Sequence, residues 1–248
     1  MTQANPEEIQ FLESVPLFAE LSKAQLEQVL AAGHRRNFSA QAFVYLQGDP
    51  AEGFCLLLEG RIKLSQVTPE GQQVILRYAA PGEAFGVIAV LSRARYPVSA
   101  ETVEDSQLLV WDQQSMRLLM ERIPQVGLNA LAILAARVRE FQDRVRELST
   151  ERVERRIARA LIRLARQTGR KTEAGILIDL PLTRQDLAEM TGTSLYTVSR
   201  TLSNWEGQGL VQSKREQVTI TYPHGLVRIA EDLPSGGAVN GWMPAAPD

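Results

Sequence analysis

The chain has 248 residues, of which 44% are apolar and 23% charged, and its formal net charge is −2. This length suits one large domain or two ordinary ones, and the apolar content is enough for a core, which excludes a wholly disordered chain. The single cysteine, Cys55, excludes an internal disulfide and a cysteine-ligated cluster. No apolar run reaches the length of a membrane span and the first residues lack a signal-sequence pattern, so we expect a cytoplasmic protein with no membrane partner.

The N-terminal half predicts short helices followed by a sheet. Apolar residues between positions 11 and 30 recur at helical spacing around Pro16. From Phe38 to Trp111 short strand-like runs alternate with glycine and proline turn signals. These runs are residues 43–46, 54–58, 61–67, 73–78 and 107–111. Regular short strands with such punctuation predict an antiparallel β-roll of the jelly-roll (double-stranded β-helix) type, in a sensor domain spanning residues 1–124.

A long helix is predicted next, over residues 125–148, with Pro124 at its start. Its apolar residues recur at steps of three and four, whereas most of its other positions are charged. This pattern predicts a seam that faces a second copy of the chain, in a dimerisation segment over residues 125–150. The seam positions are Leu131, Leu134, Val138, Phe141, Val145 and Leu148. The alternative is an ordinary core helix of one globular domain.

Charge is distributed unevenly along the chain. Residues 1–150 carry 14 basic and 18 acidic side chains, and residues 151–248 carry 13 and 11, so the net charges are −4 and +2. Seven arginines and a lysine lie between positions 152 and 171, directly after the seam. Such a run is usually a solvated helix face, but it also suits a surface that contacts phosphates.

The C-terminal part predicts a winged helix-turn-helix over residues 151–234. A helix over residues 153–165 and a short strand at 176–180 lead to Thr183, which can cap a helix over residues 184–191 together with Asp186. Gly192 ends that helix, and Ser194 can cap a second one that ends at Gly207 or Gly209. Val211 and residues 217–222 predict a hairpin, the wing. Residues 235–248 are small and rich in glycine and proline, which predicts a disordered tail.

The second of these helices is the predicted recognition helix, whose first turns face base edges in double-stranded DNA. Arg200 is the leading candidate, because its fork can bond guanine O6 and N7 together. The alternative is that Arg200 pairs with a carboxylate such as Glu206. The base-reading candidates are Arg200, Tyr196, Leu195 and Ser199, with Val198 pointing inward. The phosphate-binding candidates are Thr183, Arg184, Gln185, Ser194, Thr197 and Lys214.

Three motifs in this order carry a family resemblance. They are Pro81-Gly82-Glu83-Ala84-Phe85-Gly86, Leu182-Thr183-Arg184-Gln185-Asp186-Leu187-Ala188 and Thr197-Val198-Ser199-Arg200. With the β-roll, long helix and winged helix-turn-helix, they make residues 10–230 resemble the CRP/FNR family of bacterial transcription regulators. The resemblance implies an α+β fold and a homodimer on a pseudo-palindromic DNA site. It also implies an activator that contacts RNA polymerase, here through the loop at residues 168–175.

The resemblance also places a possible effector pocket. Cyclic-AMP receptors of the family carry Gly-Glu and Arg-Ser pairs around the sugar-phosphate and a Thr-Ser pair on the dimer helix. Here the matching positions read Gly86-Val87, Tyr96-Pro97 and Phe141-Gln142. The ribose carboxylate and the phosphate-pairing arginine are missing, which disfavours cyclic AMP. The effector is therefore unidentified or control by a ligand is lost.

Other functions remain as alternatives. A metabolite-binding or scaffolding module that does not bind DNA is one, and a metalloenzyme on a cupin-like barrel is another. The barrel from Phe38 to Trp111 has no histidines to bind a catalytic metal, so we expect no metal site, no catalytic residues and no enzymatic activity.

Overall fold

The computed structural model describes residues 5–87, 92 and 94–233. The chain forms two compact units, which are described separately. The first comprises Met1–Thr150 with Ala188–Ser194, and the second comprises Glu151–Leu187 with the chain from Leu195 onward. The predicted disordered tail, residues 235–248, lies outside the described residues.

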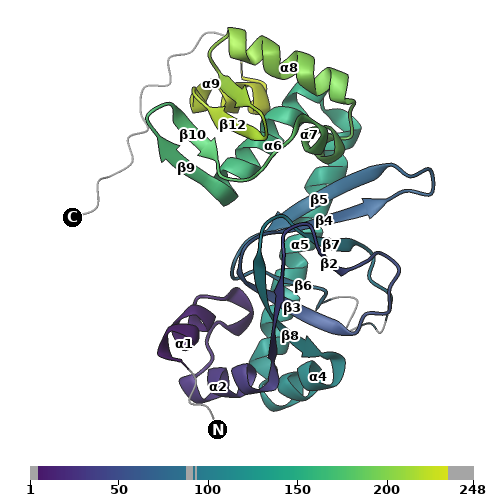
Figure 1. Ribbon diagram of the computed structural model, residues 1–248, viewed down its shortest axis with the longest axis vertical. Helices are drawn as coiled ribbons and strands as arrows, with labels where there is room; N and C mark the ends of the chain where they lie inside the picture. Colours follow the sequence, from purple (N-terminus) through teal and green to yellow (C-terminus); the bar gives the residue numbers. More distant parts are fainter. Residues whose placement is uncertain (1–4, 88–91, 93, 234–248) are drawn as a thin grey trace. The chain divides into compact units, whose positions relative to one another are not determined.

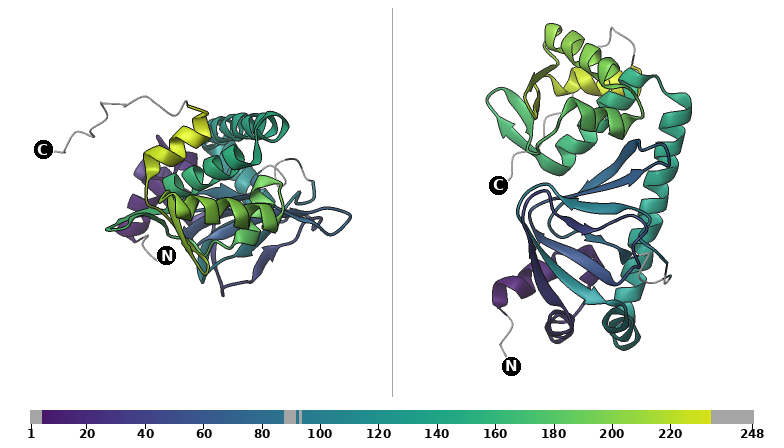
Figure 2. Two further views of the ribbon diagram at one scale, coloured as in Figure 1. Left: turned by 90° about the horizontal axis from the view of Figure 1, so that it is seen from above. Right: turned by 45° about the vertical axis from the view of Figure 1, so that its right-hand side comes forward.

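The first unit contains the predicted β-roll, built from two four-stranded antiparallel sheets (Figures 1 and 2). One sheet has the order β1-β8-β3-β6 and the other the order β2-β7-β4-β5. The strands are β1 (His34–Phe38), β2 (Phe43–Tyr45), β3 (Gly53–Glu59), β4 (Ile62–Val67), β5 (Gln73–Ala79), β6 (Ala84–Phe85), β7 (Ser99–Thr102) and β8 (Ser106–Asp112).

The β1-β8-β3-β6 sheet is covered on both faces. Its inner face lines the roll interior, where Cys55, Leu57 and Leu108 are buried. Its outer face, with Leu56 and Trp111, packs on the helices of the unit. Strand β3 therefore reads Phe-Cys-Leu-Leu-Leu without the alternation of a half-exposed strand, because neither face meets water. Cys55 is a free, buried thiol.

Among the elements that the structure describes in full, helical segments from both sides of the sheet sequence cover that outer face. They are α1 (Pro6–Glu13), the 3₁₀ turn η1 (Pro16–Phe18), α2 (Lys23–Ala32), α4 (Gln113–Arg122) and α5 (Pro124–Thr150). Helix α2 begins with a capping box between Ser22 and Gln25. Helix α5 is the predicted long helix and begins at Pro124 as expected. Buried Trp111 donates its indole N–H to the carbonyl of Val29 at 2.9 Å, which ties β8 to α2.

A winged helix-turn-helix comprises the second unit together with the segment Ala188–Ser194. Its elements are α6 (Val153–Thr168), β9 (Gly169–Thr172), β10 (Gly175–Ile178), α7 (Arg184–Thr191), α8 (Leu195–Gly207), β11 (Val211–Lys214), β12 (Gln217–Ile220) and α9 (Pro223–Glu231). The strands form a sheet with the order β11-β12-β10-β9. The buried side of α6, with Ile157, Leu161 and Leu164, supplies much of the core. Strand β10 ends two residues earlier than predicted, and α9 was not predicted.

The basic run after the seam is partly neutralised within this unit. Arg159 pairs with Glu151 at 3.1 Å and with Glu231 of α9 at 3.1 Å. Arg155 pairs with Glu151 at 3.7 Å and with Asp232 at 3.6 Å. These two arginines therefore hold α6 to the end of α9, and we assign them no role at a phosphate surface.

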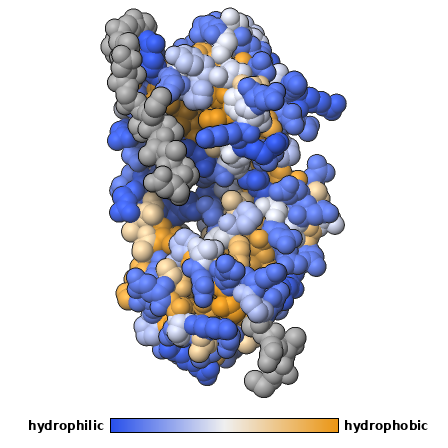
Figure 3. Space-filling model, turned by 90° about the vertical axis from the view of Figure 1, so that its left-hand side faces the viewer, coloured by the Kyte–Doolittle hydropathy of each residue, from blue (hydrophilic) through white to orange (hydrophobic). Residues whose placement is uncertain are grey.

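Hydrophilic residues dominate much of the surface shown in Figure 3, with smaller hydrophobic patches between them on both units. Within the described residues, no single helix is long and apolar enough to cross a membrane; only α4 and α5 together, across a 111° bend, would meet that criterion. The same residues contain no group of three or more His, Cys, Asp or Glu side chains placed to hold a metal ion.

Candidate nucleic-acid interface

A reciprocal cap fixes the start of the first helix of the helix-turn-helix. The Thr183 hydroxyl accepts a hydrogen bond from the Asp186 N–H at 3.0 Å and donates to Asp186 Oδ2 at 2.6 Å. The Thr183 N–H donates to the same oxygen at 2.8 Å. The predicted cap is confirmed. The backbone N–H and the side-chain O–H of Thr183 both donate to Asp186. The Thr183 hydroxyl therefore has no second hydrogen to give to a phosphate.

The turn between the two helices depends on Gly192. This residue has φ +60°, in the left-handed region that glycine adopts without strain. The Thr193 N–H closes the turn onto the carbonyl of buried Ala188 at 3.1 Å. A tight turn of this kind brings the start of α8 close behind the end of α7.

Helix α8 separates its inward and outward residues as predicted. Val198 and Leu202 are fully buried, whereas Leu195 is 47% and Tyr196 73% exposed. Arg200 is exposed and, within the described part of the chain, has no ion pair. The alternative that Arg200 pairs with Glu206 is wrong in this structure, because the described residues show no such ion pair, and Glu206 Oε1 accepts from Ser213 instead.

The other candidates for phosphate and base contacts differ in how exposed they are. Gln185 and Ser194 are exposed near the starts of the two helices, and Thr197 and Ser199 are half-buried on α8. Arg184 is half-buried and donates to the Ser213 hydroxyl at 3.0 Å. The contacts among Arg184, Ser213 and Glu206 could not be predicted, because the three residues lie up to 29 positions apart and in different elements.

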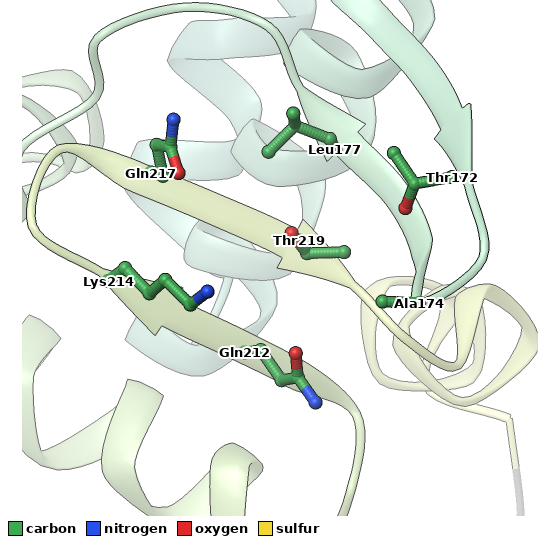
Figure 4. A pocket seen from close by; sticks show the side chains of 7 residues that line it. All are labelled: Thr172, Ala174, Leu177, Gln212, Lys214, Gln217 and Thr219. Carbon is green, nitrogen blue, oxygen red and sulfur yellow. The ribbon is translucent and has the colours of Figure 1, made fainter.

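Beside the helix-turn-helix, the outer face of the small sheet forms a groove of about 190 Å³. Figure 4 shows Gln212 and Lys214 on β11, Gln217 and Thr219 on β12, Leu177 on β10, Thr172 on β9 and Ala174 in the turn between β9 and β10. Strand β11 places Lys214 near the tip of the wing, where its side chain is exposed. The predicted loop at residues 168–175 is largely a hairpin, formed by β9 and the start of β10.

The predicted seam of α5 is exposed along its length in the single chain. Leu131 is 63% and Phe141 67% exposed, and Val138, Val145 and Leu148 are each exposed by more than two fifths. Leu134 is half-buried. Large apolar side chains aligned along one helix and open to water mark a contact surface rather than a core helix.

Comparison with known proteins gives matches to both units. The cyclic nucleotide-binding domain family matches residues 35–123, and the Crp-like helix-turn-helix domain family matches residues 155–229. The cyclic AMP receptor protein of Thermus thermophilus is 32% identical over 197 residues, which cover 79% of this chain and 88% of that protein. The chain belongs to the CRP/FNR family. It is therefore a DNA-binding transcription regulator and not an enzyme.

Two further similarities extend the comparison. The anaerobic regulatory protein of Bacillus subtilis is 24% identical over 220 residues, covering 88% of this chain and 92% of that protein. The structure of the Thermus thermophilus catabolite activator protein matches with a TM-score of 0.52 and 32% identity, covering 88% of this chain and all of that chain. The c-di-GMP-responsive regulator CLP of Xanthomonas campestris shares the fold, with a TM-score of 0.72 at 21% identity over 81% of this chain and all of that one.

In this CRP/FNR regulator the effector-pocket candidates lie in different environments. Gly86 has φ +81°, and a Cβ added there would meet the Gly53 carbonyl oxygen at 3.0 Å. Val87 packs on the outer core, between the sheet and the helices. Pro97, Phe141 and Gln142 are exposed.

Tyr96 belongs to the roll interior. Its ring stacks on Tyr45 with the ring centroids 3.6 Å apart, and its hydroxyl donates to the carbonyl of Gly53 at 2.5 Å. The Gly53 N–H donates back to that hydroxyl at 2.9 Å. Burial raises the pKa of Tyr96, so the phenol stays neutral. A neutral phenol carries no positive charge to pair with a phosphate, and the hydroxyl hydrogen of Tyr96 is already donated to Gly53.

Proposed function

We propose that this regulator acts in the cytoplasm as a homodimer, in which the α5 seams of two copies pair and two recognition helices read a pseudo-palindromic site. The exposed apolar stripe on α5 carries this proposal, because six large apolar residues at seam spacing need a partner and an identical helix supplies one. The family forms dimers, which agrees with the stripe.

For base reading, Arg200 is the proposed specificity residue, supported by Leu195, Tyr196 and Ser199. Arg200 lies in the first half of α8, exposed and without an ion pair in the described residues. Lys214, Gln185, Ser194 and Thr197 are the proposed phosphate contacts, together with Arg184. These contacts do not specify the base sequence of the DNA site.

Contact with RNA polymerase, and therefore activation, is assigned to the hairpin at residues 168–175. All four residues of β9 are exposed, and Lys171 at this edge adds a positive charge. A protein partner could contact both the exposed hairpin and the groove beside it.

As for the effector, we propose that cyclic AMP is not the ligand, although a 32%-identical relative is named for it. By the resemblance, Tyr96 stands where the cyclic-AMP receptors have their phosphate-pairing arginine, and Val87 where they have their ribose carboxylate. The roll then binds a different small effector or works without one.

The dimer-on-DNA proposal is tested by selecting bound duplexes from a random pool and footprinting the protein on the winner. We expect two protected half-sites about 34 Å apart, one helical turn from centre to centre. A single asymmetric protected site would reject the proposal. A protein that selects no sequence, with an affinity insensitive to salt, would support the scaffold alternative.

A further inference from the structure

Ser213 on the wing strand β11 connects the two helices of the helix-turn-helix. Its hydroxyl accepts a hydrogen bond from Arg184 Nη2 at 3.0 Å and donates to Glu206 Oε1 at 2.5 Å. Its backbone N–H donates to the same carboxylate oxygen at 2.8 Å. The three residues belong to α7, α8 and β11, and all three are half-buried. One serine therefore joins the start of α7, the end of α8 and the wing.

The direction of these hydrogen bonds is fixed by chemistry. Arginine can only donate and an ionised glutamate can only accept, so the serine must accept from one and donate to the other. Within the described residues Arg184 and Glu206 form no direct ion pair. The positive guanidinium and the negative carboxylate therefore act on each other through the serine hydroxyl.

The contact leaves most of Arg184 available. A guanidinium has five N–H donors in a rigid fork, and Ser213 uses one of them. Arg184 is the first residue of α7, whose start carries partial positive charge that favours a nearby phosphate. Holding one donor of the fork limits the directions in which the others can point. A free arginine would lose more side-chain entropy on binding DNA.

We infer that Ser213 and Glu206 are positioning residues that hold the Arg184 guanidinium in the orientation it needs to bind a DNA phosphate. The inference rests on the proposed contact between Arg184 and phosphate. Neither Ser213 nor Glu206 touches DNA in this arrangement; both act through Arg184.

A purely structural role for the pair would have a different signature. If Ser213 and Glu206 only fasten the wing to the helices, their loss lowers the melting temperature and leaves the number of phosphate contacts unchanged. If they orient Arg184, their loss removes a phosphate contact. The slope of log K against log salt concentration counts such contacts, at about 0.9 for each phosphate.

The test measures DNA affinity by fluorescence anisotropy over a range of salt concentrations, using the selected duplex and the full-length protein. The variants are Arg184→Ala, Ser213→Ala and Glu206→Gln, with Ser213→Thr to restore a hydroxyl. Thr219→Ala is the matched control, because it removes a hydroxyl from the same small sheet without touching the contact. We expect Arg184→Ala, Ser213→Ala and Glu206→Gln each to make the slope shallower by about 0.9 for each bound subunit.

Further expectations make the test specific. Ser213→Thr should restore the wild-type slope, Thr219→Ala should keep it, and Arg184→Ala combined with Ser213→Ala should match Arg184→Ala alone. If Arg184→Ala lowers the slope but Ser213→Ala and Glu206→Gln do not, the positioning role is overturned and the phosphate contact stands. If Arg184→Ala leaves the slope unchanged, the phosphate contact itself is wrong.

Discussion

Arg137 of the long helix α5 and Glu83 of the turn before β6 form an ion pair, with 3.4 Å between Arg137 Nη2 and Glu83 Oε1. The other oxygen of this carboxylate is bound by Arg77 of β5. Arg137 also contacts Glu140 one turn along the helix at 2.8 Å. Burial lowers the pKa of Arg77, and the Glu83 carboxylate opposes this effect. The Glu83 carboxylate therefore lets Arg77 of β5 and Arg137 of α5 lie close together.

Replacing Glu83 by glutamine should destabilise the first unit. The change leaves two half-buried guanidiniums facing each other without their shared anion, and we expect a loss of about 1 to 2 kcal/mol, because partial exposure moderates the effect. Glu140→Gln is the control, since that side chain is 63% exposed and its loss should change stability by less than about 1 kcal/mol. Urea unfolding measures both. Equal effects of the two substitutions would show that Glu83 has no special role.

Arg200 should determine one base of each half-site. Arg200→Ala should reduce discrimination at a single guanine by about 1 to 3 kcal/mol and leave the dimer intact. Arg200→Lys keeps the charge but loses the fork, so it should relax the same position while keeping more of the overall affinity. Repeating the selection of bound duplexes with each variant measures this. An unchanged base preference with Arg200→Ala would remove Arg200 from the base-reading set.

Cyclic AMP should have no effect on this protein. A ligand that binds only the folded state raises its stability, by about 2.7 kcal/mol at a hundred times its Kd. We expect neither the melting temperature nor the DNA affinity to change with cyclic AMP at about 1 mM, with the Thermus thermophilus cyclic AMP receptor protein as a positive control. A saturable rise in melting temperature would show that Tyr96 and Val87 do not exclude this ligand.

Cys55 should resist alkylation at mildly alkaline pH. Burial raises the pKa of its thiol to about 12, so the reactive thiolate stays rare in the folded protein between pH 7 and pH 9. In the unfolded chain the thiol ionises near its ordinary pKa, within this range. We expect iodoacetamide to label the native protein at pH 9 at least about a hundredfold more slowly than the urea-unfolded protein. Labelling of the native protein at pH 9 at a rate close to that of the urea-unfolded protein would contradict the burial.

The spacing of apolar residues predicted those elements that bury one regular face. The steps of three and four along α5 and the motif from Thr183 to Arg200 were sufficient for the long helix and the helix-turn-helix. Strand β1 was missed because four of its five residues, His34 to Asn37, are exposed and polar, so no apolar alternation marks it. Helix α4 was missed because the main sign of its start is one residue, Asp112. This residue caps the helix by accepting a hydrogen bond from the Ser115 N–H at 2.7 Å.

Contacts between distant positions could not be predicted from one sequence. In the sequence, Arg155 and Arg159 are part of a basic run that suits a phosphate-binding surface. The fold places Asp232 and Glu231, at the end of α9, against them. Tyr96 reads as a pocket residue by its place in the family motif, yet its stack on Tyr45 depends on β2, some fifty residues earlier. Ser213 carries no signal at all in the sequence.

The pairing of two copies through α5 is tested most directly by the mass of the protein in solution. Sedimentation equilibrium should give a dimer for the wild type and a monomer for Leu134→Asp, because the substitution puts a charge into the apolar seam. The monomer should bind the selected duplex weakly, since it loses the linkage between half-sites. Ala132→Asp adds the same charge at an exposed position off the seam and should remain a dimer. A wild-type monomer, or a Leu134→Asp variant that stays dimeric, would contradict the account.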